Sequence, residues 1–103
     1  MEKIEKLRSF LSDSPEDPFL NHALALEYIK IGNDSEARRL FLNILTLDPS
    51  YIGSYYHLAR LLERAGETEN AKAWYEKGMI AAKQSGDNHA FNELQAAYED
   101  LID

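Results

Sequence analysis

Apolar side chains recur three and four positions apart along most of this chain, and short polar stretches interrupt them at similar intervals. That spacing gathers the apolar residues on one face of an α-helix. The pattern predicts helices over residues 2–12, 18–31, 34–47, 51–65 and 68–84, with a last helix that starts at residue 87 or 88. We therefore expect an all-α fold of about six helices.

Residues at the ends of these segments support the predicted boundaries. Asp17 is a good N-cap, and Pro18 suits the first helical position because its missing N–H would have no partner there. Gly32 supplies the left-handed conformation that ends a helix. Asn33 then caps the next helix, and we expect Glu36 to complete a capping box with it.

A period of 34 residues links the second and third segments to the fourth and fifth. The paired positions are Leu24 and Leu58, Ala25 and Ala59, Gly32 and Gly66, Ala37 and Ala71, and Phe41 and Tyr75 (58 − 24 = 34 for the first pair, 75 − 41 = 34 for the last). Self-similarity at a fixed period of this length is the signature of a repeat protein. These positions resemble the tetratricopeptide repeat, a helix–turn–helix unit, and the resemblance implies a right-handed helical solenoid.

The same register extends towards both ends of the chain. Leu7 falls opposite Phe41, and Phe91 matches Tyr55 after two inserted residues, at a spacing of 36 (91 − 55). Gln95 stands where the full repeats carry a small alanine, as expected of a half repeat that has no second helix. We predict a single domain over residues 1–103, made of an N-terminal half-repeat helix (1–14), two full repeats (17–50 and 51–86) and a C-terminal capping helix (87–103).

Composition narrows the class of protein without naming a partner. An apolar fraction of 45% is sufficient for a packed core, and a net charge of −7 disfavours nucleic acid and anionic membranes as partners. The absence of cysteine excludes disulfides and thiolate metal sites, and no apolar run reaches membrane-spanning length. The charged first residues lack the apolar run of a signal peptide. We expect a soluble, cytoplasmic protein without a cofactor.

The residues do not predict catalysis. Ser54 and Ser85 have no nearby histidine in a nucleophilic arrangement, and the glycines punctuate helices and do not form a phosphate-binding loop. Carboxylate pairs such as Glu67 and Glu69 are typical of a solvated helix face. We expect a protein that is not an enzyme.

The resemblance points instead to binding, because the first helix of each repeat lines the concave side of such solenoids. The residues that packing leaves over on that side mix apolar and basic groups, which favours an acidic or amphipathic protein segment as partner. An alternative stays open, in which Arg60 and Arg64 are a solvated helix edge tied to Glu63 or Glu67. The predicted partner contacts are Phe19, His22, Leu26, Ile29, Lys30, Tyr56, His57, Arg60, Arg64 and His89.

One branch of the resembled family holds the C-terminal carboxylate of heat-shock chaperones through a clamp of Lys, Asn and Arg residues. At the matching positions this chain has His22, Leu26, His57, His89 and Glu93, so we do not expect that mode of binding. All three histidines fall in or near the groove. If they converge, the groove should gain positive charge as the pH falls through about 6.5. Metal capture is the sharper form of this hypothesis, but the spacing matches no ligand motif.

A structural role is the main rival to partner binding. Leu7 and Phe10 have no upstream helix to cover their far side, so the array could self-associate or continue a larger one. We expect a monomer or a weak homodimer.

Overall fold

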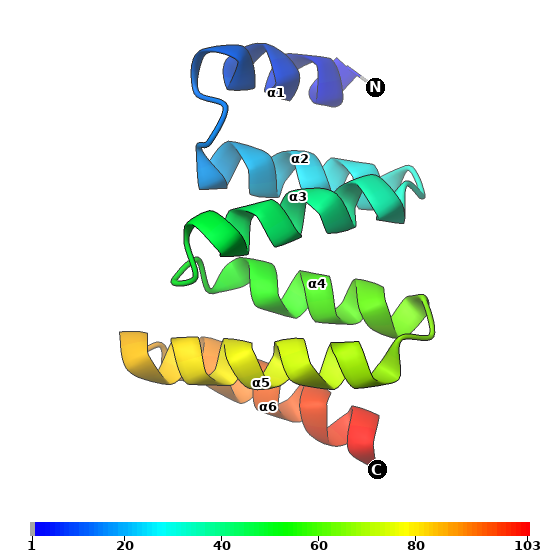
Figure 1. The fold of residues 1–103 in the computed structure, drawn as a ribbon, viewed down its shortest axis with the longest axis vertical. Coiled ribbons are helices and arrows are strands. Elements are labelled where there is room, and N and C mark those ends of the chain that lie inside the picture. Colours follow the sequence, from blue (N-terminus) through cyan, green and yellow to red (C-terminus); the bar gives the residue numbers. More distant parts are fainter. Residues whose placement is uncertain (1) are drawn as a thin grey trace. The chain divides into compact units, whose positions relative to one another are not determined.

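The computed structural model describes residues 2–103 and confirms the predicted all-α fold (Figure 1). Within those residues every regular element is a helix. The helices are α1 (Glu2–Asp13), α2 (Pro18–Lys30), α3 (Asp34–Leu47), α4 (Gly53–Arg64), α5 (Thr68–Ser85) and α6 (Asn88–Ile102). They form two compact units, one ending at Asp48 and the other starting at Pro49.

Local chemistry at the helix ends explains these bounds. The Asp17 carboxylate accepts a hydrogen bond from the Leu20 backbone N–H at 3.1 Å, and Pro18 opens α2. Gly32 has a φ of +81°, which lets the Asn33 N–H reach back to the Tyr28 carbonyl at 2.8 Å. Each predicted helix is therefore present, with its ends within two residues of the predicted ones.

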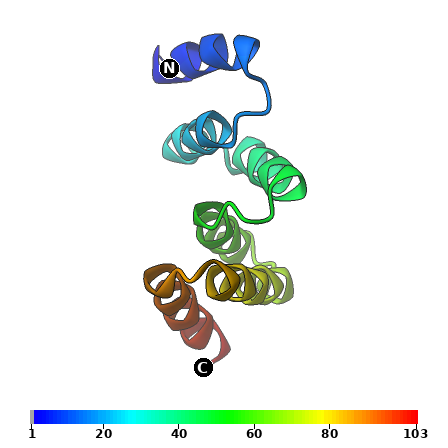
Figure 2. The same cartoon turned by 90° about the vertical axis from the view of Figure 1, so that its left-hand side faces the viewer.

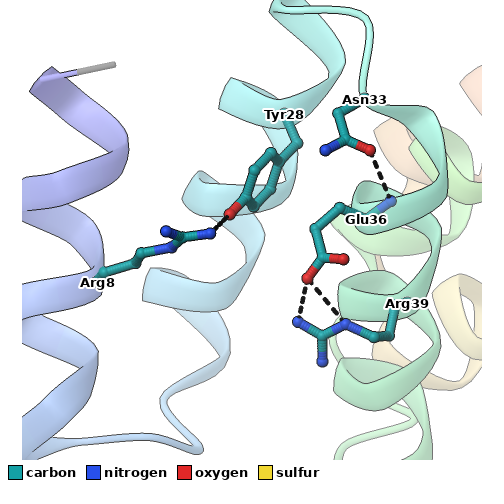
Figure 3. Close-up of polar contacts among 5 residues, drawn as sticks. All are labelled: Arg8, Tyr28, Asn33, Glu36 and Arg39. Atoms are coloured by element: carbon teal, nitrogen blue, oxygen red, sulfur yellow. Dashed lines mark hydrogen bonds and ion pairs between the residues drawn. The ribbon is translucent and has the colours of Figure 1, made fainter.

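The predicted capping box at the start of α3 forms only by half (Figure 3). The Asn33 side chain accepts a hydrogen bond from the Glu36 backbone N–H at 3.3 Å. The Glu36 carboxylate does not reach back to Asn33, because it accepts a hydrogen bond from Arg39 Nε at 2.9 Å. That charge-assisted bond holds the pKa of the Glu36 carboxyl below its ordinary value.

The first unit is built around α2, which lies beside α1 on one flank and α3 on the other (Figure 2). Its core buries Leu24 and Ala25 of α2 with Ala37 and Phe41 of α3. The Arg8 guanidinium donates a hydrogen bond to the hydroxyl of buried Tyr28 and so ties α1 to α2 (Figure 3). Ala25 and Ala37, which the 34-residue period pairs with Ala59 and Ala71, are fully buried.

The second unit packs α5 between α4 and α6. Leu58, Ala59, Ala71 and Tyr75 are all fully buried there. Gly78 has no alternative at its position, since a Cβ would lie 2.7 Å from the Cβ of Tyr55 and 3.1 Å from Leu94 Cδ1. The glycine thus allows both neighbouring helices to approach α5.

Three apolar side chains are more exposed than their helical phase predicts. The spacing of apolar residues places Ile31, Leu47 and Ile80 on the apolar faces of their helices, but 50%, 58% and 59% of their surfaces are exposed. Ile31 follows the last residue of α2, and Leu47 ends α3, so the register of the helix no longer directs them inwards. Across residues 2–103, no helix combines the length and the apolar character needed to cross a membrane.

Candidate functional site

The predicted partner contacts divide between the two units. Phe19, His22, Leu26, Ile29 and Lys30 lie on α2 in the first unit. The second unit carries the remaining five, on α4 and α6: Tyr56, His57, Arg60, Arg64 and His89. Each unit therefore carries its own group of these residues.

The α2 surface is mainly apolar. Phe19 has 68% of its surface exposed, while Leu26 and Ile29 are half-buried. The His22 ring meets the Phe41 ring edge-on, with the two centroids 5.5 Å apart. Lys30 adds less positive charge than expected, because its ammonium lies 2.9 Å from Glu27 Oε2 and lowers the pKa of that carboxyl.

The α4 surface is organised by Tyr75, a fully buried residue of α5. Its hydroxyl donates a hydrogen bond to the Glu63 carboxylate, and burial followed by this bond raises the pKa of the Tyr75 phenol far above its ordinary value. The Tyr56 ring stands edge-on to Tyr75, with centroids 6.4 Å apart. Tyr75 thus fixes the positions of both Glu63 and Tyr56.

Arg60 belongs to this network, because its guanidinium donates a side-chain hydrogen bond to the Tyr75 hydroxyl. Its Nη1 is 3.8 Å from Glu63 Oε2, a long ion pair, and 52% of the side chain is exposed. An exposed pair at this distance contributes little to stability. The Tyr75 hydroxyl thus links Glu63 and Arg60, and the guanidinium has further N–H donors on its exposed part. The ion pair between Arg60 and Glu63, which the sequence offered as an alternative interpretation of Arg60, is therefore present but weak.

A small pocket of about 180 Å³ opens between α4 and α6. Tyr56 and His57 form its α4 wall, and Asp87 and Glu93 give the other side an acidic character. Its remaining lining residues are Ile52, Gly53, Ala90 and Leu94. The sequence-based site omitted Asp87 and Glu93, although the 36-residue register had placed Glu93 opposite His57 (93 − 57 = 36).

The histidines differ in their surroundings. Burial lowers the pKa of the His57 imidazole; Glu93 opposes this shift and Arg64 reinforces it. His89 is 92% exposed on α6, and its Nε2 lies 4.0 Å from Glu93. His22 belongs to the other unit. Among the described residues, no three His, Asp or Glu side chains are grouped so that they could hold a metal ion.

Comparison with known proteins gives these surfaces a context. A family model described as tetratricopeptide repeat matches residues 52–87. The crystal structure of a tetratricopeptide repeat domain protein from Salinibacter ruber is 40% identical, with a TM-score of 0.81, and the match covers 84% of this chain and 96% of that one.

Two further relatives differ in what they share with the chain. One is the tetratricopeptide repeat and J domain-containing co-chaperone DNJ1 of Fusarium oxysporum f. sp. lycopersici, which is 39% identical over 73 residues. The match covers 71% of this chain but only 13% of the co-chaperone's length. The first TPR of Spaghetti (RPAP3), solved bound to the HSP90 peptide SRMEEVD, has a TM-score of 0.76 over 97% of this chain and 78% of that one. At 21% identity, that likeness shows the fold alone.

Proposed function

Because the chain belongs to the tetratricopeptide repeat family, we propose that it binds a segment of another protein on the exposed side of α4. Proteins of this family are generally interaction modules without catalytic activity, and their stacked helices present surfaces for partners. We propose neither a reaction nor a cofactor for this chain. A cytoplasmic location belongs to the same proposal and rests on the absence of cysteine, since small extracellular domains often depend on disulfides.

The observation that carries this proposal is the Tyr75–Glu63 hydrogen bond beneath the α4 surface. The Glu63 carboxylate accepts this hydrogen bond and forms only a long ion pair with Arg60. The exposed donors of the Arg60 guanidinium can therefore bind a partner carboxylate. Tyr56 stands beside it as a rigid aromatic contact, and Tyr and Arg are the usual carriers of interface energy. A preformed surface also reduces the cost of ordering this chain on binding.

The charge of the neighbouring pocket refines the proposed partner. Arg60 and Arg64 favour an acidic residue over α4, whereas Asp87 and Glu93 favour a hydrogen-bond donor or a cation over the pocket between α4 and α6. We therefore propose an amphipathic segment of mixed charge. Phe19, Leu26 and Ile29 give the first unit a separate apolar contact surface for the same partner or another.

Affinity capture with variant baits tests the α4 surface. Arg60→Glu combined with Arg64→Glu reverses two charges without altering a buried side chain, so its helical circular dichroism should match the wild type. Lys3→Glu with Lys6→Glu is the matched control, because it changes the net charge equally on α1. A genuine partner is retained by the control and lost from the Arg60/Arg64 bait, with a weaker dependence on salt for whatever binding remains. Capture of the partner by both variant baits would show that α4 is not the binding surface.

Self-association is a second candidate function, and one feature of the first unit favours it. A largely apolar hollow of about 320 Å³ lies between α1 and α2, where Leu7 and Ala23 form its walls and 60% of Phe10 is exposed. Lys3, Lys6 and Glu27 surround these apolar side chains. Light scattering at high protein concentration distinguishes this function, because partner binding through α4 requires only a monomer.

A further inference from the structure

A second hollow in the first unit lies between the start of α2 and the end of α3. Its volume is about 470 Å³, within the usual range of about 300–1,000 Å³ for ligand pockets. Its walls combine apolar and polar groups from the loop before α2 and from both helices: Pro15, Glu16, Pro18, Asn21, Asn43, Ile44, Leu47 and Asp48. None of these residues belongs to the surfaces described above.

The 34-residue register gives each residue of this pocket a counterpart in the second unit. Asn21 corresponds to Tyr55 (55 − 21 = 34), and the two side chains make the same hydrogen bond. Asn21 Nδ2 donates to the Pro15 carbonyl at 3.0 Å, and the Tyr55 hydroxyl donates to the Pro49 carbonyl at 2.5 Å. The carbonyl that accepts a hydrogen bond from the phenol in the second unit thus has a counterpart in the first unit, where it accepts one from an amide.

The two positions differ because Tyr55 carries an aromatic ring and Asn21 does not. In the second unit the buried Tyr55 lies against Gly78 and faces the Trp74 ring at 6.0 Å. In the first unit Asn21 has no ring, and Ile44 replaces the glycine (78 − 44 = 34), so its side chain takes part of the space that the ring fills in the second unit. Both residues nevertheless line an open pocket. The first unit therefore keeps the hydrogen-bond acceptor of this site and lacks its ring.

Leu47, at the end of α3, adds an exposed apolar wall to this pocket. It lines the pocket, and 58% of its surface is exposed. Its counterpart in the second unit is the smaller Ala81 (81 − 47 = 34), so this wall is particular to the first unit. A large apolar side chain beside an open, partly polar pocket is a favourable wall for a planar ring.

We propose that this pocket binds a tyrosine side chain of a partner segment, whose ring lies over Ile44 and Leu47 and whose hydroxyl points towards the carbonyl that corresponds to the partner of Tyr55 in the second unit. The apolar edge of the ring would lie against Leu47 and Ile44. Its hydroxyl would donate to the Pro15 carbonyl or to the neighbouring Glu16 carboxylate. The site is separate from the α4 surface, so either could fail without the other.

Nuclear magnetic resonance titration of the whole chain tests the proposal with N-acetyltyrosinamide as probe and N-acetylleucinamide as comparison. The tyrosine probe should shift the side-chain amide resonances of Asn21 and Asn43, and the leucine probe should shift them much less. Asn21→Tyr should abolish the response of the Asn43 amide, because a ring on residue 21 would then project into the pocket.

A second substitution keeps the test decisive if Asn21→Tyr disturbs folding. Leu47→Asp removes the apolar wall from an exposed position and should weaken the response to the tyrosine probe by about tenfold or more. Ile80→Asp is the matched control, since Ile80 is equally exposed, at 59%, but lies on α5. Equal shifts with both probes, or equal loss in Leu47→Asp and Ile80→Asp, would overturn the proposal.

Discussion

Ala71 shows how much a single small side chain decides in this fold. It is fully buried on α5, as its counterpart Ala37 is on α3, and each sits where the two helices of a repeat pack closely. Ala71→Leu should overpack that contact and lower the free energy of unfolding by about 1–3 kcal/mol. Urea denaturation measures the loss, and Ala96→Leu on the exposed side of α6 is the control. Coincident midpoints for Ala71→Leu and the wild type would show that the repeat register is wrong.

His57 gives the second unit a dependence on pH. Its pKa is lowered by burial in the folded state, so the unfolded chain binds more protons as the pH falls through about 6.5, the ordinary value for histidine. Stability is therefore lost on the acid side of that value. Glu93 on α6 reduces the effect and Arg64 on α4 increases it. His57 should therefore gain its positive charge at a lower pH than the value of about 6.5 expected from the sequence.

Urea unfolding at about pH 7.5 and about pH 5.5 tests this sign. The wild type should lose more stability between the two values than His57→Gln, which has no imidazole to protonate. His89→Gln is the control, because His89 is 92% exposed. Equal losses in the wild type and His57→Gln would mean that burial does not disfavour the charged imidazole.

At the scale of the helix, capping side chains mark the starts of α2, α3 and α6. The Asp17 carboxylate accepts the Leu20 N–H at 3.1 Å and places negative charge at the start of α2. Asp17→Ala should cost about 1 kcal/mol of stability, within the usual range of about 0.5–2 kcal/mol for a lost N-cap. Asp13→Ala removes the same charge at the end of α1, where a carboxylate is unfavourable, and should not destabilise. Thermal unfolding of both variants makes the comparison, and an equal loss would attribute the effect to net charge.

At the scale of the whole molecule, two polar residues oppose end-to-end assembly. Lys3 occupies the position of the buried Ala37 (37 − 3 = 34), and Gln95 that of the buried Ala59 (95 − 59 = 36). Two copies could associate by packing α6 of one copy against α1 of the other, in the way that the two helices of a repeat pack. This contact would bury Lys3 and Gln95 at positions where the full repeats bury alanines. Burying an unpaired lysine is costly, so the 103-residue chain should be monomeric in dilute solution.

Replacing those residues should reverse this behaviour. Lys3→Ala with Gln95→Ala is expected to raise the average mass at high concentration in sedimentation equilibrium, because the apolar hollow beside Phe10 could then be covered. Lys72→Ala with Gln84→Ala makes the same change of composition on α5 and should remain monomeric. Equal association of both variants, or association of the wild type as strong as that of Lys3→Ala with Gln95→Ala, would show that Lys3 and Gln95 do not oppose assembly.

The sequence by itself determined the helices, their ends and the repeat. Each of these depends on residues close together in the chain or on a fixed period: Asp17 caps within three residues, and Gly32 ends a helix through its own backbone. The burial of Ala37 and Ala71 followed from the same period, because equivalent positions of a repeat meet equivalent neighbours.

Only the tertiary structure decided which side chains meet across helices. The hydrogen bond between Tyr75 and Glu63 joins α5 to α4, and the acidic pocket needs α6 beside α4. The space left beside Asn21 depends in turn on the side chains that α3 brings opposite. Helical phase assigns a residue to a face but gives neither the rotamer nor the partner, so the chemistry of these sites was set by packing between helices.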